Sequence, residues 1–188
     1  TEVGDLNVGR EQISGAGTTS AALGFGGNAP PAVTNNESWN GSAWTEVNDL
    51  NKETRRGAGI GTQTSAFLAG GYAAPTIRTY TENYNGTSWT EANNMNTARD
   101  DNSLSGRGAP YTSVISVFGD STETWDGTNW TETTEVNTGR KSGSGAGASS
   151  TSAVIYGGYT SPPTTYYTRT ELWNGTTWTE LNDLSSAR

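Results

Sequence analysis

The sequence of 188 residues contains no histidine and no cysteine. Without histidine, the chain cannot form a Ser-His-Asp triad, use an imidazole as general base, or bind a metal through imidazole. Without cysteine, it has no disulfide framework, no thiolate nucleophile and no thiolate metal site. These absences exclude the named chemistries but leave carboxylates, and we predict a protein that is not an enzyme, with no catalytic residue, no metal site and no cofactor.

Charge and long apolar runs are also scarce. Charged residues make up 16% of the chain, and hydrophobic residues without glycine 31%; typical globular domains have about 25% charged residues and about 45–50% apolar residues when glycine is counted. The net charge is −8, and no cluster of lysine and arginine forms the basic surface that phosphate groups require. We therefore expect neither nucleic acid nor an anionic membrane surface as a partner. No apolar run approaches the ~18 residues of a membrane-spanning helix.

Glycine, with 25 residues, and aromatic residues, with seven tryptophans and eight tyrosines, are abundant instead. Disordered chains are also polar, but they contain few aromatic residues. Aromatic side chains favour strands and stabilise sheets through cross-strand packing. The composition therefore indicates a β protein with small-residue strands and aromatic anchors.

One sequence motif recurs four times, as in ESWNGSAWTEVNDL and ELWNGTTWTELNDL. Its last tryptophan stands at Trp44, Trp89, Trp130 and Trp178, with spacings of 45, 41 and 48 residues. Two aromatic positions flank an Asn-Gly or Asp-Gly step, the pair preferred in type I′ turns, where both central residues need φ > 0. Each copy of the motif is therefore predicted to be a β-hairpin with a two-residue turn.

Each period also holds a Gly/Ala-rich run, an apolar run ending in glycine and a loop of variable length. The period thus provides four short antiparallel strands in about 44 residues, as a propeller blade does. We predict an all-β fold, a β-propeller with four blades of four antiparallel strands each, as a single domain or propeller segment over residues 1–188. The repeats are approximately 1–44, 45–89, 90–130 and 131–178, with a connector copy at 179–188.

Five features recur in order in the repeats: a glycine pair, a glutamate, an aromatic residue on the third strand, a tryptophan opening the fourth strand and an arginine after the next loop. In these features the repeats resemble those of the Kelch-like propeller family. The third repeat departs, with Gly119-Asp120 in place of the glycine pair and almost no loop before its third strand. Some Kelch-like propellers are copper radical oxidases, which need histidine and cysteine, so the resemblance does not imply that activity here. The repeated glutamates are Glu37, Glu82, Glu123 and Glu171, and the arginines are Arg10, Arg55, Arg99, Arg140 and Arg188.

A glycosidase needs two carboxylates in different environments, and such a pair is normally unique in a chain. A glutamate needed in every blade is better explained by structure. We therefore predict that the repeated glutamates and arginines form structural pairs or cap backbone groups, and that the repeated tryptophans pack the blades.

The loops before the third strands differ most between repeats: Asn28–Asn36, Tyr72–Thr81 and Tyr159–Thr170. A rigid scaffold leaves such loops free to vary and to carry function, and exposed aromatics with arginine are typical of interface anchors. The candidate ligand-binding residues are Tyr72, Arg78, Tyr80, Tyr159, Tyr166, Tyr167 and Arg169.

The leading functional hypothesis is a recognition or adhesion module on an extracellular or virion surface, which binds a glycan or a protein partner through these loops. The Thr/Asn/Gly-rich, acidic composition is similar to that of surface proteins of bacteria and their phages. Two alternatives stay open: a structural assembly subunit and a glycan-processing enzyme. The head TEVGDLNVGR matches the tail TELNDLSSAR, so we expect a mature product or a part of a larger array, whose redundant ends pair with another chain or further blades.

Overall fold

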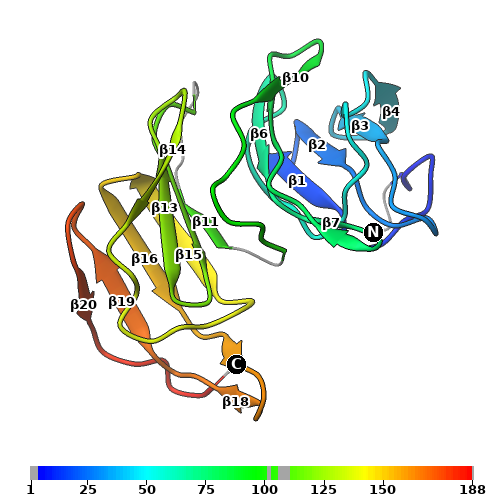
Figure 1. The fold of residues 1–188 in the computed structure, drawn as a ribbon. Coiled ribbons are helices and arrows are strands. Elements are labelled where there is room, and N and C mark those ends of the chain that lie inside the picture. The colour runs from blue at the N-terminus through cyan, green and yellow to red at the C-terminus, as the bar shows by residue number, and fades with distance from the viewer. Residues whose placement is uncertain (1–3, 101–102, 106–110, 188) are drawn as a thin grey trace. The chain divides into compact units, whose positions relative to one another are not determined.

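The computed structural model describes residues 4–100, 103–105 and 111–187, with the backbone alone at Ser103–Ser105. The chain divides into two compact units, Thr1–Asp100 and Asp101–Arg188, and each contains two four-stranded antiparallel sheets (Figure 1). We call these sheets blades 1 to 4 in chain order. Over the described ranges every regular element is a strand, in agreement with the all-β prediction.

In unit 1, each blade contains the four short antiparallel strands that the repeat predicts. Blade 1 consists of β1 (Ser14–Gly17), β2 (Ala22–Phe25), β3 (Asn36–Trp39) and β4 (Trp44–Val47). Blade 2 consists of β5 (Ala58–Thr62), β6 (Ser65–Ala69), β9 (Thr81–Tyr84) and β10 (Trp89–Ala92).

Unit 2 repeats this arrangement, although the Gly/Ala-rich run of the third repeat, at residues 103–108, lies outside the described residues at 106–108. Blade 3 consists of β11 (Ser103–Ser105), β12 (Val114–Phe118), β13 (Ser121–Trp125) and β14 (Trp130–Thr133). Blade 4 consists of β15 (Ser144–Ser149), β16 (Ser152–Tyr156), β19 (Thr170–Trp173) and β20 (Trp178–Glu180). Within the part of the chain that the structure describes, no helix has the length and apolarity to cross a membrane.

The hairpin between the third and fourth strands differs from the predicted two-residue type I′ turn. In blade 1, Trp39 pairs with Trp44, so four residues form the loop. Gly41 has a φ of 96°, but Asn40 is not among the residues with positive φ, and type I′ requires positive φ at both positions. Instead, the Asn40 Oδ1 atom accepts the N–H groups of Ser42 and Ala43, each at 3.0 Å. The asparagine is therefore explained by side-chain capping of the loop.

Each blade has two distinct faces. The first, which we call the tryptophan face, carries the paired aromatic residues, such as Trp39 and Trp44 with ring centroids 5.3 Å apart. The second, which we call the forward face, packs against the tryptophan face of the following blade inside each unit. In unit 1 this packing forms a core of Leu23, Phe25, Leu50, Ala66, Leu68, Tyr84 and Trp89, with Ala16 and Val47 against it. In unit 2 the core consists of Ile115, Val117, Val136, Ala153, Ile155, Trp173 and Trp178.

The first strands of neighbouring blades lie side by side within each unit, β1 along β5 and β11 along β15. Small residues permit this approach. A Cβ atom added to Gly59 would lie 2.7 Å from the Cζ atom of Phe25 and 3.1 Å from the carbonyl oxygen of Gly15. The glycine of β5 is therefore explained by the close approach of the neighbouring blade.

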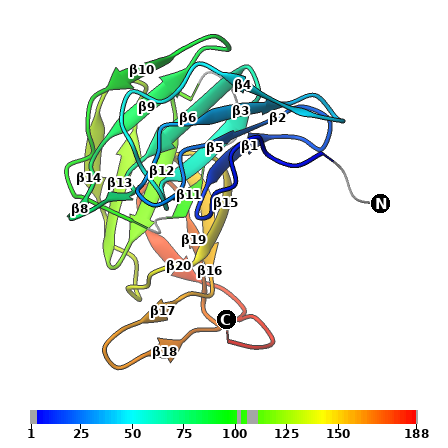
Figure 2. The same ribbon diagram turned by 90° about the vertical axis from the view of Figure 1, so that its right-hand side faces the viewer.

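Two of the loops before third strands contain small hairpins that the sequence pattern did not predict. In blade 2, β7 (Tyr72–Ala73) pairs with β8 (Thr76–Ile77), and in blade 4, β17 (Tyr159–Thr160) pairs with β18 (Thr165–Tyr166). Figure 2 shows the β17–β18 hairpin extending beyond β16 and β19. These strands have two residues each, too few for a pattern of alternating side chains to be visible in the sequence.

Candidate binding site

The variable loops and the connectors between blades meet at the same end of the sheets within each unit. Tyr72 and Arg55 exchange backbone hydrogen bonds of 2.8 and 3.0 Å, and Tyr159 and Lys141 do the same at 3.0 and 2.8 Å. In each case, the first residue after the glycine pair is held by the connector. The variable loops and the connectors therefore share one end of the sheets within each unit.

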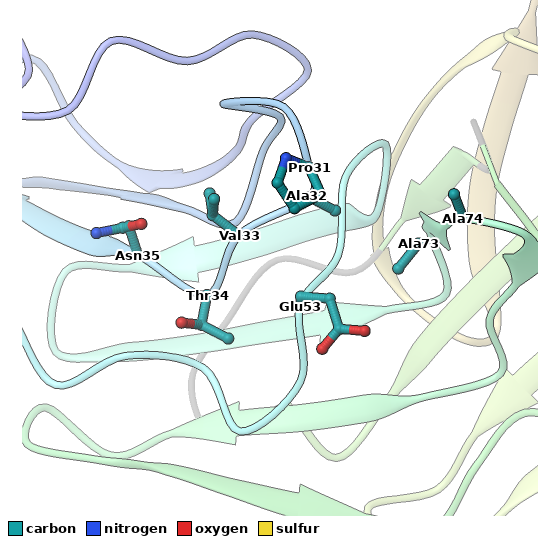
Figure 3. A pocket seen from close by; sticks show the side chains of 8 residues that line it. All are labelled: Pro31, Ala32, Val33, Thr34, Asn35, Glu53, Ala73 and Ala74. Carbon is teal, nitrogen blue, oxygen red and sulfur yellow. The ribbon is translucent and has the colours of Figure 1, made fainter.

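Unit 1 has a pocket of about 440 Å³ at this end of its sheets. In Figure 3, the Glu53 side chain lies between Val33 and Thr34 on one side and Ala73 and Ala74 on the other. The volume is within the range of about 300–1,000 Å³ that small-ligand sites occupy. The lining comes from the blade 1 loop, the connector and the β7–β8 hairpin: Pro31, Ala32, Val33, Thr34, Asn35, Glu53, Ala73 and Ala74.

Backbone hydrogen bonds fix the blade 1 side of this pocket. The N–H group of Val33 donates to the carbonyl oxygen of Gly27 at 3.0 Å, and that of Leu50 donates to the oxygen of Thr34 at 3.0 Å. The N–H group of Thr54 donates to the oxygen of Val33 at 3.4 Å. Because the connector holds the loop at successive residues, the pocket is formed before any ligand arrives.

The pocket combines an apolar wall with a carboxylate, a hydroxyl and an amide. Glu53 Oε1 lies 3.2 Å from Arg78 Nη2, and its side chain remains 51% exposed. The guanidinium of Arg78 lies over the ring of Tyr80, 5.3 Å from its centroid. The hydroxyl of Thr34 donates to Asp49 Oδ2 at 3.4 Å. Glu53 is therefore oriented by an arginine that is itself held by an aromatic ring, while its second oxygen can accept hydrogen bonds from a ligand.

The predicted site residues of unit 1 are not among the residues that line this pocket. Tyr72 lies under the guanidinium of Arg55, with 5.0 Å from the Cζ atom to the ring centroid. Arg78 and Tyr80 stack as described, and Arg78 reaches the pocket through Glu53. Most of the residues that line the pocket belong to the predicted variable loops. The aromatic and arginine residues chosen within those loops do not line it.

The predicted site residues of unit 2 lie on the β17–β18 hairpin and the segment after it. Tyr159 and Tyr166 pack with ring centroids 5.9 Å apart, and Tyr166 is 61% exposed. Tyr167 lies 6.0 Å from the guanidinium carbon of Arg140. Arg169 donates to Glu180 Oε1 at 2.7 Å and to Thr138 Oγ1 at 2.8 Å.

The repeated glutamates are buried and serve the scaffold. Glu37 accepts hydrogen bonds from the Arg10 guanidinium and from the N–H group of Asn7, the latter at 2.7 Å. Burial raises the pKa of Glu37, but the hydrogen bonds from Arg10, Asn7 and Val8 oppose it and hold that pKa below its ordinary value. In unit 2, Arg140 binds Glu171 in the same way, and burial lowers the pKa of Arg140 against the opposing charge of Glu171. The predicted structural pairing is confirmed for these two pairs.

The prediction that Arg55 pairs with a repeated glutamate is wrong. In blades 1 and 4 the arginine stands three residues after the asparagine that binds the glutamate, but three residues after Asn51 the chain has Thr54. Glu82 instead accepts the Asn51 N–H group at 2.9 Å and that of Lys52 at 3.1 Å. Arg55 comes one residue too late, and its side chain stacks on Tyr72. The predicted Arg188 lies outside the described residues.

Glu53 lines the pocket but was not among the predicted site residues, although the sequence distinguishes it from the equivalent residues of the other repeats. It stands two residues after Asn51, where the other repeats have Gly9, Ala98 and Gly139. A charged residue at a place otherwise reserved for small ones indicates a local role in one blade. Among the described residues, no three acidic side chains gather in a way that could hold a metal ion.

No family model and no curated protein matches the sequence. Among solved structures, the chain is similar to the structure of YjhT, with a TM-score of 0.78 and 14% sequence identity. The match covers 95% of this chain and 72% of that chain. At this identity the likeness concerns the fold alone. With the four antiparallel sheets, it shows that the chain has a β-propeller fold of four blades.

Proposed function

We propose that this protein is a non-catalytic recognition module that binds a glycan in the pocket between the blade 1 loop and the β7–β8 hairpin. The observation that supports this most directly is the pocket itself, preformed and lined by both apolar and polar groups. Hydroxyl groups of a sugar would donate to the Glu53 carboxylate and exchange hydrogen bonds with Thr34 and Asn35. The C–H face of the sugar ring would pack on Pro31 and Val33.

Several features agree with a surface role for such a module. The recurrence of glycine pair, glutamate, aromatic residue, tryptophan and arginine supports membership in the Kelch-like repeat family. The acidic, Thr/Asn/Gly-rich composition supports an extracellular or virion-surface location and a role in adhesion. The buried, arginine-paired state of Glu37 and Glu171 supports a non-catalytic role, since both carboxylates are engaged by the scaffold.

The test is a glycan array followed by titration calorimetry with the best-binding glycan. Glu53→Gln keeps the shape of the side chain but removes its charge, so we expect affinity to fall about 10- to 100-fold, as for a lost hydrogen bond to a charged group. Glu91→Gln, at an exposed glutamate of β10 that pairs with Lys52, is the matched control and should bind as the wild type does. An array without binding above background, or equal affinity of both variants, would contradict the proposal.

A protein partner is the second candidate, because Tyr166 of the β17–β18 hairpin is 61% exposed and packs against the ring of Tyr159. Tyrosine at an exposed position combines a large apolar surface with a hydroxyl group, as interface anchors do. If this hairpin is the recognition element, Tyr166→Ala should abolish capture of a host-surface protein that the wild type retains, while Glu53→Gln should retain it.

A further inference from the structure

The charges around the unit 1 pocket narrow the kind of glycan that it can take. Of the eight residues that line it, Glu53 alone carries a formal charge. One oxygen of this carboxylate, Oε1, lies 3.2 Å from Arg78 Nη2, and the side chain remains 51% exposed. The other oxygen is thus left for a ligand, and it favours a donor over an acceptor.

A second carboxylate, that of Asp49, stands behind the blade 1 wall of the pocket. Its Oδ2 atom accepts the Thr34 hydroxyl at 3.4 Å, and its Oδ1 atom accepts the N–H group of Asn36 at 3.1 Å. Both donors are neutral, so these contacts leave the charge of Asp49 unbalanced. Since Thr34 lines the pocket, a ligand that contacts its hydroxyl would lie within the roughly 8 Å over which charges act in physiological salt.

The positive groups at this end of unit 1 do not balance the two carboxylates inside the pocket. Arg78 contacts Glu53 from outside the lining, and Arg55 lies over an aromatic ring. The loop segments that supply most of the wall, residues 28–36 and 72–77, contain no lysine or arginine. A ligand in the pocket therefore meets two acidic groups and no cationic lining residue.

The apolar part of the wall strengthens the effect of Glu53. Figure 3 shows its carboxylate between Val33 on one side and Ala73 and Ala74 on the other. Such side chains exclude water from a bound ligand, and an electrostatic attraction is stronger where water is excluded. The same arrangement disfavours a ligand that brings a negative charge, because like charges would then meet without solvent between them.

We propose that the pocket takes an amino sugar, a saccharide unit whose unacetylated amine is positively charged. This inference rests on the proposed glycan function and names the class of glycan for the same site. The ammonium group donates a charge-assisted hydrogen bond to the second oxygen of Glu53, and a neighbouring sugar hydroxyl reaches Thr34. Glycans that carry carboxylate or sulfate groups are rejected by Glu53 and Asp49.

Titration calorimetry with three β1,4-linked disaccharides tests the proposal: that of glucosamine, its N-acetylated form and that of glucose. At about pH 6, where an aliphatic amine is protonated, the glucosamine form should bind about 10- to 100-fold more tightly than the other two, as for a hydrogen bond between charged groups. This advantage should shrink in added salt. It should also shrink at about pH 9, where the sugar amine has lost most of its protons.

The pH effect belongs to the ligand, because the chain has no histidine and the charged groups around the pocket are carboxylates and guanidinium groups, which do not titrate in this range. The variants are compared by the ratio of the two affinities, amine over acetylated amine. Glu53→Gln should remove most of this preference, and Asp49→Asn should reduce it. Glu91→Gln, at the exposed glutamate that pairs with Lys52, should preserve it.

A lysine blocked at its α-amine and carboxyl group distinguishes a sugar amine from a peptide amine, and it should bind more weakly than the glucosamine disaccharide. Equal affinity of the two would overturn the amino-sugar class in favour of a basic peptide. Equal affinity of the glucosamine and N-acetylated forms, with both weakened by Glu53→Gln, would overturn the inference and leave the glycan site intact. If none of the disaccharides binds, the inference falls, and the glycan array decides whether the proposed function falls with it.

Discussion

Glu37 and Glu82 occupy equivalent places on the third strands of blades 1 and 2, yet their charges are balanced differently. Both carboxylates are at most 1% exposed. Glu37 meets the Arg10 guanidinium, which also donates to the carbonyl oxygens of Gly26 and Gly24 at 2.8 and 2.9 Å. Glu82 is held by N–H groups of Asn51 and Lys52. Removal of the two charges should therefore have unequal effects.

We expect Glu37→Gln to cost about 3–5 kcal/mol, because it leaves the buried Arg10 without its counter-charge. Glu82→Gln should cost about 1–3 kcal/mol, since the glutamine oxygen can still accept the N–H groups of Asn51 while the N–H group of Lys52 loses its acceptor. Urea unfolding followed by tryptophan fluorescence measures both. A loss at Glu82 that equals or exceeds the loss at Glu37 would contradict the difference that we infer between the two blades.

The lowered pKa of Glu37 predicts a loss of stability in acid. Its ordinary value is 4.5, and the hydrogen bonds from Arg10 and Asn7 outweigh burial in the folded protein. A carboxyl group with a lower pKa in the folded state contributes stability above its unfolded pKa, and this contribution is lost as pH falls through the folded value. The melting temperature should thus stay nearly constant from neutral pH to about pH 5 and fall below pH 4.5. Glu37→Gln should melt lower throughout, with a shallower fall in acid.

At the scale of one hairpin, the capping side chain explains the Asn-Gly and Asp-Gly steps. In blade 2, Asn85 Oδ1 accepts the N–H groups of Thr87 and Ser88, each at 2.9 Å. In blade 3, Asp126 makes the same contacts, and the backbone hydrogen bonds of Asn129 and Thr128 lower its pKa. An asparagine and an aspartate thus perform one role in different repeats.

We expect Asn85→Ala to destabilise the protein by about 1 kcal/mol through the lost cap. Asn85→Asp should be nearly neutral at pH 7, because the native Asp126 shows that a carboxylate fits this loop. Thermal unfolding of the two variants measures the effect. Equal melting temperatures for Asn85→Ala and the wild type would show that the loop does not depend on the cap.

The packing of one blade on the next depends on the small residues of the first strands. A methyl group at Gly59 would meet both the Phe25 ring and the backbone of Gly15. We expect Gly59→Ala to cost about 1–3 kcal/mol, as overpacked cores do. Gly9→Ala, where an added Cβ atom meets nothing within 4 Å, is the control and should change stability by less than about 0.5 kcal/mol. Chemical denaturation of both variants measures whether the blade interface tolerates an added methyl group.

The sequence alone predicted most of the elements, for a physical reason. Every blade must make the same strand turns and fill the same space, so its residues are repeated four times and stand out from chance. The departures were harder to interpret. Thr54 occupies the position where blades 1 and 4 have an arginine, and Arg55 follows one residue later. Arg55 therefore looked equivalent to Arg10 by residue type, although its spacing from the repeated asparagine differs.

The pocket could be predicted only in part. Its loops were identified by their variation, but the aromatic and arginine residues chosen there turn toward connectors and each other. Arg78, for example, stacks on Tyr80 and reaches the pocket only through Glu53. The residues of the wall are mostly small and apolar, and which of them face a common space depends on how two blades pack. That information belongs to the tertiary structure.

For the whole molecule, the central claim is that a propeller scaffold presents a preformed glycan site in unit 1. The measurement that tests it most directly is a titration of the isotope-labelled protein with the best-binding glycan of the array, followed by backbone NMR. We predict shift changes concentrated at residues 31–35, at Glu53 and at residues 73–74, with little change on the β17–β18 hairpin. Changes centred on Tyr159–Tyr167, or spread evenly over both units, would contradict the assignment of the site.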